Sequence, residues 1–289
     1  MTSSTDQSSA DQTSCKQISI LGSGWLGLPL ATELQQAGYS IKTSTRSPER
    51  QQQIQTEGID TYLFDIESDD NELKLLQADI LIINITSKNT EAFKALIRQI
   101  EASPISKVLF ISSTSVYADS SKPNPTAITE ADLSALKPCP LLEIENLLID
   151  NSHFETSIIR FAGLMGYQRH PGRFFLRQGE NNELSCKPIR NPDGLVNMIH
   201  RDDCIGIIEA VIKQNNWGEI FNGCSSQHPT RREFYTWAVA DYSDKESIAM
   251  NFATTDVQSY KIIDNAKVKS HLAYVFKQDD FFANQLSDS

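Results

Sequence analysis

Residues 17–27 read Gln-Ile-Ser-Ile-Leu-Gly-Ser-Gly-Trp-Leu-Gly, and no other stretch says more about the fold. A short β-branched run leads directly into G-x-G-x-x-G, and apolar residues at helical spacing follow. In such a strand–turn–helix unit the first glycine makes the tight turn, the second lets a pyrophosphate approach the backbone, and the third lets the helix pack closely. The helix N-terminus adds unpaired N–H groups and partial positive charge. This context favours a dinucleotide-binding loop over a chance glycine turn, and its candidate residues are Gly22, Gly24, Trp25, Leu26 and Gly27.

The composition describes a globular protein with an acidic balance. The chain has 289 residues, of which 39% are hydrophobic and 22% charged, and its formal net charge is −11. A field of that sign repels polyanions, so we expect no nucleic-acid partner. The longest apolar runs, such as residues 80–83, are too short to span a bilayer, so we expect no membrane segment.

The cysteines show no pattern typical of disulfides or metal sites. Their number, five, is odd, and no C-x-x-C pair occurs, which favours free thiols in a reducing cytoplasm. No histidine spacing is typical of a metal-binding motif, so we expect no metal. Residues 1–14 are polar, of low complexity and without the apolar stretch of a secretory signal. We therefore predict a disordered tail on a cytoplasmic protein.

Strand and helix patterns alternate through the first half. Strand patterns lie at about 16–21, 39–43, 61–64, 80–85, 107–112 and 156–160, with helical patterns at about 25–37, 47–56, 90–101 and 140–149. This alternation predicts an α/β fold, a Rossmann-type doubly wound parallel sheet with ligands beyond the carboxyl ends of its strands. After residue 163, loops separate shorter elements at about 202–214, 219–222, 230–241 and 264–271. We expect a tail over 1–14, a dinucleotide-binding core over 15–163, and a smaller C-terminal substrate lobe over 164–289, partly interleaved with the core.

The end of the second predicted strand bears on the cofactor. It reads Thr-Ser-Thr-Arg over residues 43–46, where an NAD site usually places an acidic residue that holds the ribose hydroxyls. The missing acid and the guanidinium of Arg46 leave room for a 2′-phosphate, so NADP is preferred, with NAD as the alternative. A solvated arginine at a helix start is the other interpretation of Arg46. Asp65, just past the third strand, is a candidate partner of the adenine amino group or else a strand-end cap.

Residues 110–118, Phe-Ile-Ser-Ser-Thr-Ser-Val-Tyr-Ala, resemble the strand-end motif of the extended short-chain dehydrogenase/reductase superfamily, the branch of NAD(P)-dependent epimerases and dehydratases. The resemblance implies a catalytic role for Ser113, which takes the family's Ser/Thr position four residues before Tyr117. It also places Ser112 beside the cofactor. Tyr117 is the phenol nearest in sequence and is a candidate acid/base, with Tyr167 as another.

Two further segments extend the resemblance over most of the chain. Residues 160–166, Arg-Phe-Ala-Gly-Leu-Met-Gly, resemble the family segment that passes the nicotinamide, which implies cofactor contacts for Arg160 and Gly163. Residues 199–203, Ile-His-Arg-Asp-Asp, resemble the family element I-H-x-D-D, which opens a helix. Within that element His200 is a candidate substrate residue, and the alternative is a purely structural role.

The chain departs from the family at its catalytic pair. The family places Tyr and Lys one helical turn apart, in Tyr-x-x-x-Lys, so that lysine lowers the tyrosine pKa. No tyrosine in this chain has a lysine four residues later. Alignment on Glu145 puts Lys137 at the Tyr position and Leu141 at the Lys position. The chain therefore resembles atypical members, which keep the dinucleotide fold without the standard active site.

Two basic clusters occur in the second half of this acidic chain. They are Arg-His-Pro-Gly-Arg at residues 169–173 and His-Pro-Thr-Arg-Arg at residues 228–232. The superfamily uses arginines of this lobe to hold the diphosphate of a nucleotide-sugar, and guanidinium groups suit phosphate or carboxylate. We therefore expect an anionic small-molecule substrate, with candidate residues Arg169, His170, Arg173, His200 and Arg231. Solvated arginines at a turn and a helix start are the alternative.

Three functions remain open at this stage. The first is an NAD(P)-dependent oxidoreductase or epimerase for a nucleotide-sugar-like anion, with a non-standard active site and a monomeric or homodimeric state. The second is a dinucleotide-binding sensor or regulatory protein without turnover. The third rests on Gly-Trp-Leu-Gly-Leu-Pro-Leu-Ala at residues 24–31, which is similar to nucleotide-sugar dehydrogenases of the 6-phosphogluconate-dehydrogenase type. Those proteins need a long helical domain, for which the chain is too short.

Overall fold

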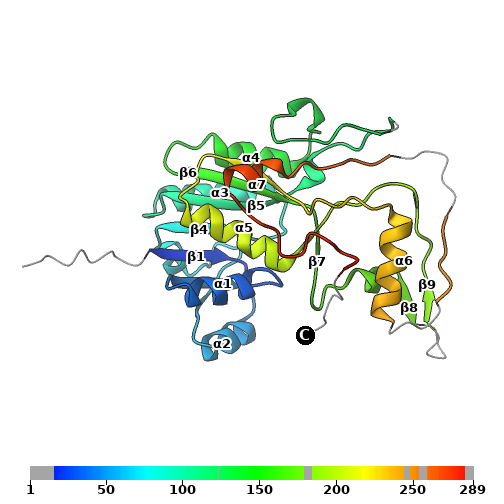
Figure 1. Ribbon diagram of the computed structural model, residues 1–289. Helices are drawn as coiled ribbons and strands as arrows, with labels where there is room; N and C mark the ends of the chain where they lie inside the picture. Colours follow the sequence, from blue (N-terminus) through cyan, green and yellow to red (C-terminus); the bar gives the residue numbers. More distant parts are fainter. Residues whose placement is uncertain (1–15, 123, 179–183, 244–247, 254–258, 284–289) are drawn as a thin grey trace, which may run out of the picture.

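A seven-stranded parallel sheet forms the centre of the molecule (Figure 1). The computed structural model describes residues 16–122, 124–178, 184–243, 248–253 and 259–283, so the predicted tail over 1–14 lies outside the described residues. The strand order is β11-β6-β5-β4-β1-β2-β3, and every neighbouring pair is parallel. These strands are β1 (Gln17–Leu21), β2 (Ser40–Thr45), β3 (Asp60–Leu63), β4 (Ile80–Ile83), β5 (Lys107–Ser113), β6 (Glu155–Phe161) and β11 (Ile220–Gly223).

Helices cover both faces of this sheet, as the alternation of patterns predicts. Helix α3 packs on α4, and α1 packs on α5. The helices around the sheet are α1 (Gly27–Gln36), α2 (Pro48–Thr56), α3 (Thr90–Glu101), α4 (Pro140–Ile149), α5 (Arg201–Lys213) and α7 (Ala266–His271). Because both faces are covered, the central strand β4 is apolar throughout, and all four of its residues are buried. The predicted Rossmann-type doubly wound fold is confirmed.

Local signals in the sequence set the helix starts. Ser47 accepts the N–H of Arg50 at 3.2 Å and Pro48 occupies the first helical position, so α2 begins where its cap predicts. Thr230 and Glu233 form a reciprocal capping box at the start of α6 (Arg231–Tyr242). Each cap satisfies N–H groups that a helix start otherwise leaves without partners.

Two short sheets and α6 form a smaller lobe beside the main sheet. The pairs are β7 (Gly163–Met165) with β10 (Met198–His200), which are parallel, and β8 (Leu176–Gln178) with β9 (Leu184–Cys186), which are antiparallel. Short 3₁₀ turns lie at Leu73–Leu76, Thr114–Val116, Leu133–Ala135 and Pro171–Phe174. The lobe has its own apolar cluster, which includes Met165, Met198, Phe234 and Phe281. Residues beyond 163 also return to the main sheet, because β11 pairs with β6.

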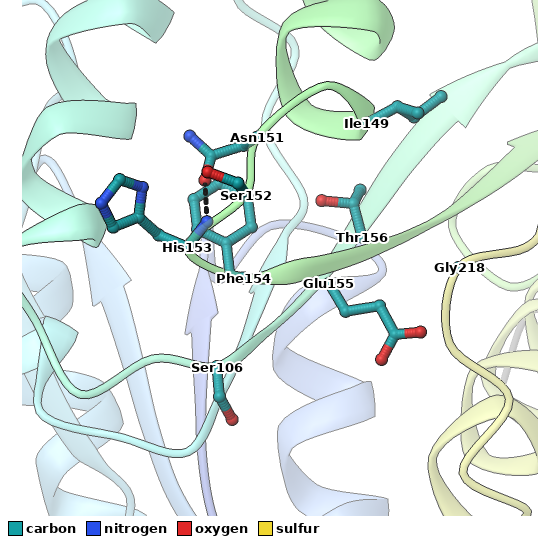
Figure 2. Close-up of a pocket in the computed structure, with 9 residues that line it drawn as sticks. All are labelled: Ser106, Ile149, Asn151, Ser152, His153, Phe154, Glu155, Thr156 and Gly218. Carbon is teal, nitrogen blue, oxygen red and sulfur yellow. Dashed lines mark hydrogen bonds between the residues drawn. The ribbon is translucent and has the colours of Figure 1, made fainter.

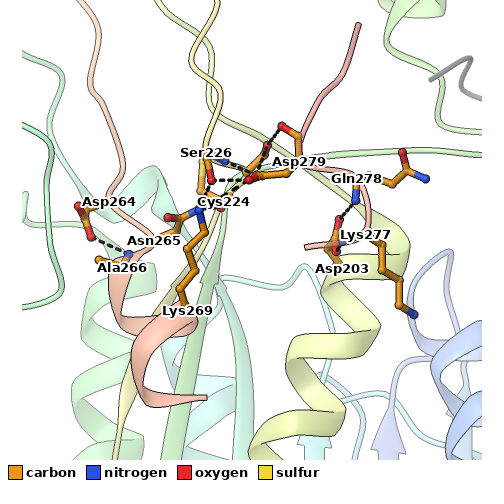
Figure 3. Close-up of polar contacts among 11 residues, drawn as sticks. Asp203, Cys224, Ser226, Asp264, Asn265, Ala266, Lys269, Lys277, Gln278 and Asp279 are labelled. Atoms are coloured by element: carbon orange, nitrogen blue, oxygen red, sulfur yellow. Dashed lines mark hydrogen bonds and ion pairs between the residues drawn. The ribbon is translucent and has the colours of Figure 1, made fainter. Parts of the chain in front are cut away.

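The chain after α7 is held against α5 and the segment just beyond β11 (Figure 3). The carboxylate of Asp203, in the first turn of α5, accepts the backbone N–H of Lys277 at 2.6 Å and that of Gln278 at 3.1 Å. Asp279 accepts the N–H of Ser226 at 2.6 Å, just beyond β11. The second aspartate of the Ile-His-Arg-Asp-Asp element therefore holds the C-terminal segment in place.

Candidate functional site

The three glycines of the loop between β1 and α1 differ in what surrounds them. Gly22 has φ +106°, and a Cβ there would collide with the carbonyl oxygen of Asn84. A Cβ on Gly27 would collide with the carbonyl oxygen of Gly22. A Cβ on Gly24 would meet nothing within 4 Å. The fold itself therefore requires glycine at positions 22 and 27, whereas position 24 borders open space, where a ligand can approach the backbone.

The backbone N–H groups of this loop differ in whether they have a hydrogen-bond partner. Ser44 at the end of β2 accepts the N–H of Gly22 with its hydroxyl and the N–H of Ser23 with its carbonyl, both at 2.9 Å. The N–H groups of Trp25 and Leu26 donate no hydrogen bond within the described residues. They precede α1, whose first turn carries no acidic side chain. This helix start is thus a ready anion site of the kind that holds a pyrophosphate.

A cavity of about 440 Å³ opens beside this loop, at the carboxyl ends of β1 to β4. Its walls come from the glycine loop, the end of β2, the end of β3 and the end of β4. The lining includes Gly22, Gly24, Arg46, Asp65 and Asn84. Four of the predicted cofactor residues therefore come together here. The loop, the free N–H groups and this cavity fit the pyrophosphate and adenosine part of a dinucleotide.

The adenosine end of the cavity carries two arginines. The Arg46 side chain is 79% exposed, and its Nη1 lies 4.0 Å from Oδ2 of Asp65. Arg50, one helical turn further on, also lines the cavity. The sequence interpretation missed Arg50, although its i+4 spacing from Arg46 is a usable signal. No acidic residue directly follows β2, although Asp65 and Glu67 line the same cavity as the two arginines.

The Ser-rich end of β5 contributes one accessible hydroxyl rather than two. Ser113, the last residue of β5, is half-buried, and its Oγ accepts the N–H of Ser115 at 3.1 Å. Ser112 is 6% exposed and donates its hydroxyl to the buried carboxylate of Glu145. The side chain of Ser112 is thus turned into the core, and its cofactor contact stays a prediction that this geometry does not favour.

Tyr117 and Arg160 belong to a buried polar network. The Tyr117 hydroxyl donates to Oδ1 of Asn222 at 2.9 Å and accepts from Nη1 of Arg160 at 2.7 Å. Arg160 is 2% exposed, and its Nη2 lies 2.6 Å from a carboxylate oxygen of the fully buried Glu145. Burial raises the pKa of Tyr117. The Tyr117 hydroxyl and all three guanidinium nitrogens of Arg160 thus bond inside the core. The cofactor contact of Arg160 and the acid/base role of Tyr117 stay predictions that this geometry does not favour.

Lys137 and Leu141, which align with the family's Tyr-Lys pair, lie around the start of α4. Lys137 lies before α4 rather than one turn earlier on the helix, and its N–H donates to the carbonyl of Val116 at 2.9 Å. Leu141 is buried on α4. The Lys137 side chain carries no phenol, and the Leu141 side chain carries no ammonium group.

Two histidines of the second half, His170 and His200, form hydrogen bonds within the protein. His200 accepts the N–H of Asp202 and caps α5, and burial lowers its pKa. Its ring also packs against Gly166, where a Cβ would collide with it. His170 is 1% exposed, accepts the N–H of Gly172 at 3.1 Å, and lies 3.0 Å from Asp241. Both rings are thus engaged within the protein, and the substrate contacts of His170 and His200 stay predictions that this geometry does not favour.

The arginines of the lobe remain open to solvent to different degrees. Arg169 and Arg173 are exposed, and they donate to the carbonyls of Leu164 at 3.0 Å and Gln168 at 2.9 Å. Arg231 is half-buried, lies 6.0 Å from the Tyr235 ring, and its Nε has no partner within the described residues. Gly163 is exposed at the start of β7. No group of three metal-binding side chains occurs in the part of the chain that the structure describes.

A second hollow lies at the opposite edge of the sheet (Figure 2). Ser106 and Glu155 line it at the amino ends of β5 and β6, with His153 and Gly218 nearby. Ligands of open parallel sheets bind at the carboxyl ends, so this shallow hollow is not part of the candidate site. None of the helices among the described residues is long and apolar enough to cross a membrane.

Comparisons with known proteins agree with this geometry. The model of the NAD-binding domain of 6-phosphogluconate dehydrogenase matches residues 17–138. Protein YeeZ of Escherichia coli K12 is 30% identical over 286 residues, which cover 92% of this chain and 97% of YeeZ. The chain therefore belongs to the family of YeeZ.

Solved structures share the whole fold. A putative NAD-dependent epimerase/dehydratase from Methylobacillus flagellatus is 24% identical, covers 93% of this chain and 96% of its own, and has a TM-score of 0.67. MoeE5, solved with UDP-glucose and NAD, is 16% identical, with coverage of 94% and 97% and a TM-score of 0.72. The chain thus has the fold of NAD-dependent epimerases and dehydratases of the short-chain dehydrogenase/reductase superfamily. The 6-phosphogluconate-dehydrogenase match stops within the first half, and the longest helix described beyond it has 13 residues.

Proposed function

We propose that this member of the YeeZ family is an NADP-preferring oxidoreductase or epimerase that acts on an anionic, nucleotide-sugar-like small molecule. The observation that carries the proposal is the open position at Gly24, beside free N–H groups and a cavity of about 440 Å³. A bound nicotinamide would supply hydride transfer at the other end of the same cleft. MoeE5 was solved with UDP-glucose and NAD, which supports this substrate class.

The preference for NADP rests on Arg46 and Arg50. Both line the adenosine end of the cavity, and no acidic residue follows β2 to hold two free ribose hydroxyls. A 2′-phosphate would accept hydrogen bonds from these guanidinium groups, whereas NAD would leave them unused. Asp65 is close enough to Arg46 to compete for it, which limits the expected preference.

The chemistry proposed for the chain's own groups centres on Ser113. Its hydroxyl lies at the carboxyl end of β5, where the superfamily orients a reacting hydroxyl or carbonyl. Tyr167 is the remaining phenol of the candidate set. Its hydroxyl donates to Asp202 at 2.8 Å, and burial together with that bond raises its pKa, so it is suited to donating a proton rather than to accepting one. Arg169 and Arg231 are the arginines proposed to hold the substrate anion.

A second candidate function is a dinucleotide-binding sensor or regulatory protein without turnover. The burial of Tyr117 and Leu141 favours it, because neither of these side chains is free to serve as an acid or base beside Ser113. General acid–base catalysis typically contributes about 10²–10⁴-fold, and a protein without it keeps binding but loses most of its rate.

Two measurements separate these functions. Calorimetry with NADPH and NADH tests the cofactor, and Arg46→Ala is expected to weaken NADPH binding by about ten-fold or more while NADH binding stays nearly constant. If the wild type prefers NADH, the NADP proposal is wrong.

Turnover is assayed with UDP-glucose and UDP-glucuronic acid in the presence of each dinucleotide. Ser113→Ala is expected to abolish turnover with dinucleotide affinity intact. Ser115→Ala, an exposed neighbour whose side chain has no assigned role, is the matched control. Tight dinucleotide binding without turnover on any sugar nucleotide would favour the sensor.

A further inference from the structure

Two guanidinium groups from the second half of the chain lie near the indole ring of Trp25. The Cζ atom of Arg169 is 5.7 Å from the ring centroid, and that of Arg201 is 5.3 Å from it. Arg201 also stacks on Tyr167, with Cζ 3.7 Å from that ring, and its Nη1 lies 3.4 Å from the Trp25 carbonyl oxygen. These four side chains, the Trp25 cluster, come from three distant segments and meet beside the pyrophosphate loop.

The positive charge of the cluster is not neutralised within the described residues. Neither Arg169 nor Arg201 forms an ion pair there. Asp202, the residue after Arg201, touches the cluster only through Tyr167: it accepts the Tyr167 hydroxyl at 2.8 Å and lies 3.5 Å from Nδ1 of His200. Two arginines that lie near one indole ring without an ion pair stand out in a protein with a net charge of −11.

The cluster also contains donors without acceptors. Nε1 of Trp25 and Nε of Arg201 are buried, and neither has a hydrogen-bond partner among the residues described. A buried donor of this kind is costly, and native structures rarely keep one without a reason. Tyr167 holds a left-handed backbone with φ +49°, a strain that collects at ligand-binding sites.

We propose that Trp25, Arg169 and Arg201 bind the phosphate or carboxylate group of the second ligand, next to the pyrophosphate of the dinucleotide. Gly24, whose Cβ position borders open space, directly precedes Trp25 in the chain. Planar guanidinium groups hold such anions with paired hydrogen bonds, and the indole N–H adds a third donor. The proposal rests on the proposed function, because the second ligand is the substrate of that site. The sequence predicted Trp25 only as a residue of the dinucleotide-binding loop, whereas this proposal places its side chain at the binding site of the second ligand.

The test uses the full chain saturated with NADPH, so that the pyrophosphate loop is filled. Calorimetric titrations with inorganic phosphate and, separately, with glucuronate distinguish a phosphate site from a carboxylate site. Arg169→Gln and Arg201→Gln are each expected to lower the affinity for the preferred anion by about ten-fold or more. Arg177→Gln, which removes an exposed arginine of β8 in the same lobe, is the matched control and is expected to change it less than about two-fold.

Each remaining outcome decides the proposal. Equal anion affinity in the wild type and all three variants would overturn it. A wild type that binds phosphate through Arg169 and Arg201 but binds no dinucleotide would refute the proposed function and leave the anion site standing. If Arg201→Gln does not fold, Arg201→Lys and the exposed Arg169→Gln carry the test.

Discussion

The carboxyl ends of β1 and β5 lie two strands apart in one sheet, and they are built on different principles. At β1 the site consists of backbone: Gly24 borders open space, and free N–H groups follow it. At β5 the polar side chains after the strand turn inward, so that Tyr117 and Ser112 bond to Asn222 and Glu145 in the core. The first region is shaped to receive a ligand, whereas most polar groups of the second stabilise the protein.

This contrast shows which kinds of sequence pattern predict a functional site from family resemblance and which do not. A glycine pattern constrains the backbone directly, so the same pattern gives the same loop. A serine or tyrosine after a strand becomes catalytic only if its partners leave it free. Here the serine and the tyrosine are both bonded to one buried ion pair: Ser112 donates to Glu145, and Arg160 donates to Tyr117.

The largest loss of stability is expected from breaking the ion pair between Glu145 and Arg160. Glu145→Ala would leave the Arg160 guanidinium buried without its counter-charge, which typically costs about 3–5 kcal/mol of stability. Chemical denaturation of the wild type and the variant measures it. Lys94→Ala, which removes an ion pair with Glu91 on exposed side chains, is the control and should change stability little. A small loss in Glu145→Ala would mean that the network is not what holds the β5 region closed.

The glycine loop predicts two opposite outcomes within one motif. Gly27→Val is expected to destabilise the protein by about 1–3 kcal/mol or more, because its side chain would collide with the Gly22 backbone. Gly24→Val is expected to leave stability nearly unchanged and to weaken dinucleotide binding by about ten-fold or more, because its side chain fills the space for the pyrophosphate.

Thermal unfolding and calorimetry with NADPH measure the two glycine variants side by side. Unchanged dinucleotide affinity in a folded Gly24→Val variant would contradict the dinucleotide interpretation of the loop. Equal destabilisation of both variants would show that Gly24 serves the fold as Gly27 does.

The sequence was sufficient for the fold and for the nucleotide half of the site. Strand and helix patterns, the cap at Ser47 and the glycine spacing are local signals, and the structure follows them. The inward turn of Tyr117 depends on Asn222, 105 residues away, and the charge partner of Arg160 lies on a different element. Such pairings follow from tertiary packing, so a motif alone could not reveal them.

A smaller loss of stability is expected from removing the hydroxyl of Tyr117, the tyrosine of the motif at the end of β5. Tyr117→Phe removes one hydroxyl that joins Asn222 and Arg160, and we expect a loss of about 1–2 kcal/mol because buried groups lose a partner. Dinucleotide affinity and any turnover should stay within about two-fold of wild type. A selective loss of turnover in a stable Tyr117→Phe variant would bring the phenol back into the chemistry.

The smallest effect concerns His200, which the motif presents as a substrate residue and the structure uses as a helix cap. Its neutral ring accepts the N–H of Asp202, and burial lowers its pKa below the usual value near 6.5. A base with a lowered folded-state pKa contributes stability that is fully present above the unfolded pKa and is lost as pH falls through 6.5 toward the folded value.

The free energy of unfolding should therefore fall between pH 7.5 and pH 5.5, with a contribution from His200 of up to about 1 kcal/mol. His200→Asn keeps an oxygen that can cap α5 but cannot titrate, so this part of the slope should disappear in denaturation curves measured across that range. His228, whose pKa burial also lowers, should keep part of the slope. His153→Asn, which changes an exposed histidine, is the control. A slope that is unchanged in His200→Asn would show that the ring is not neutral at the helix start, and a substrate role for His200 would regain support.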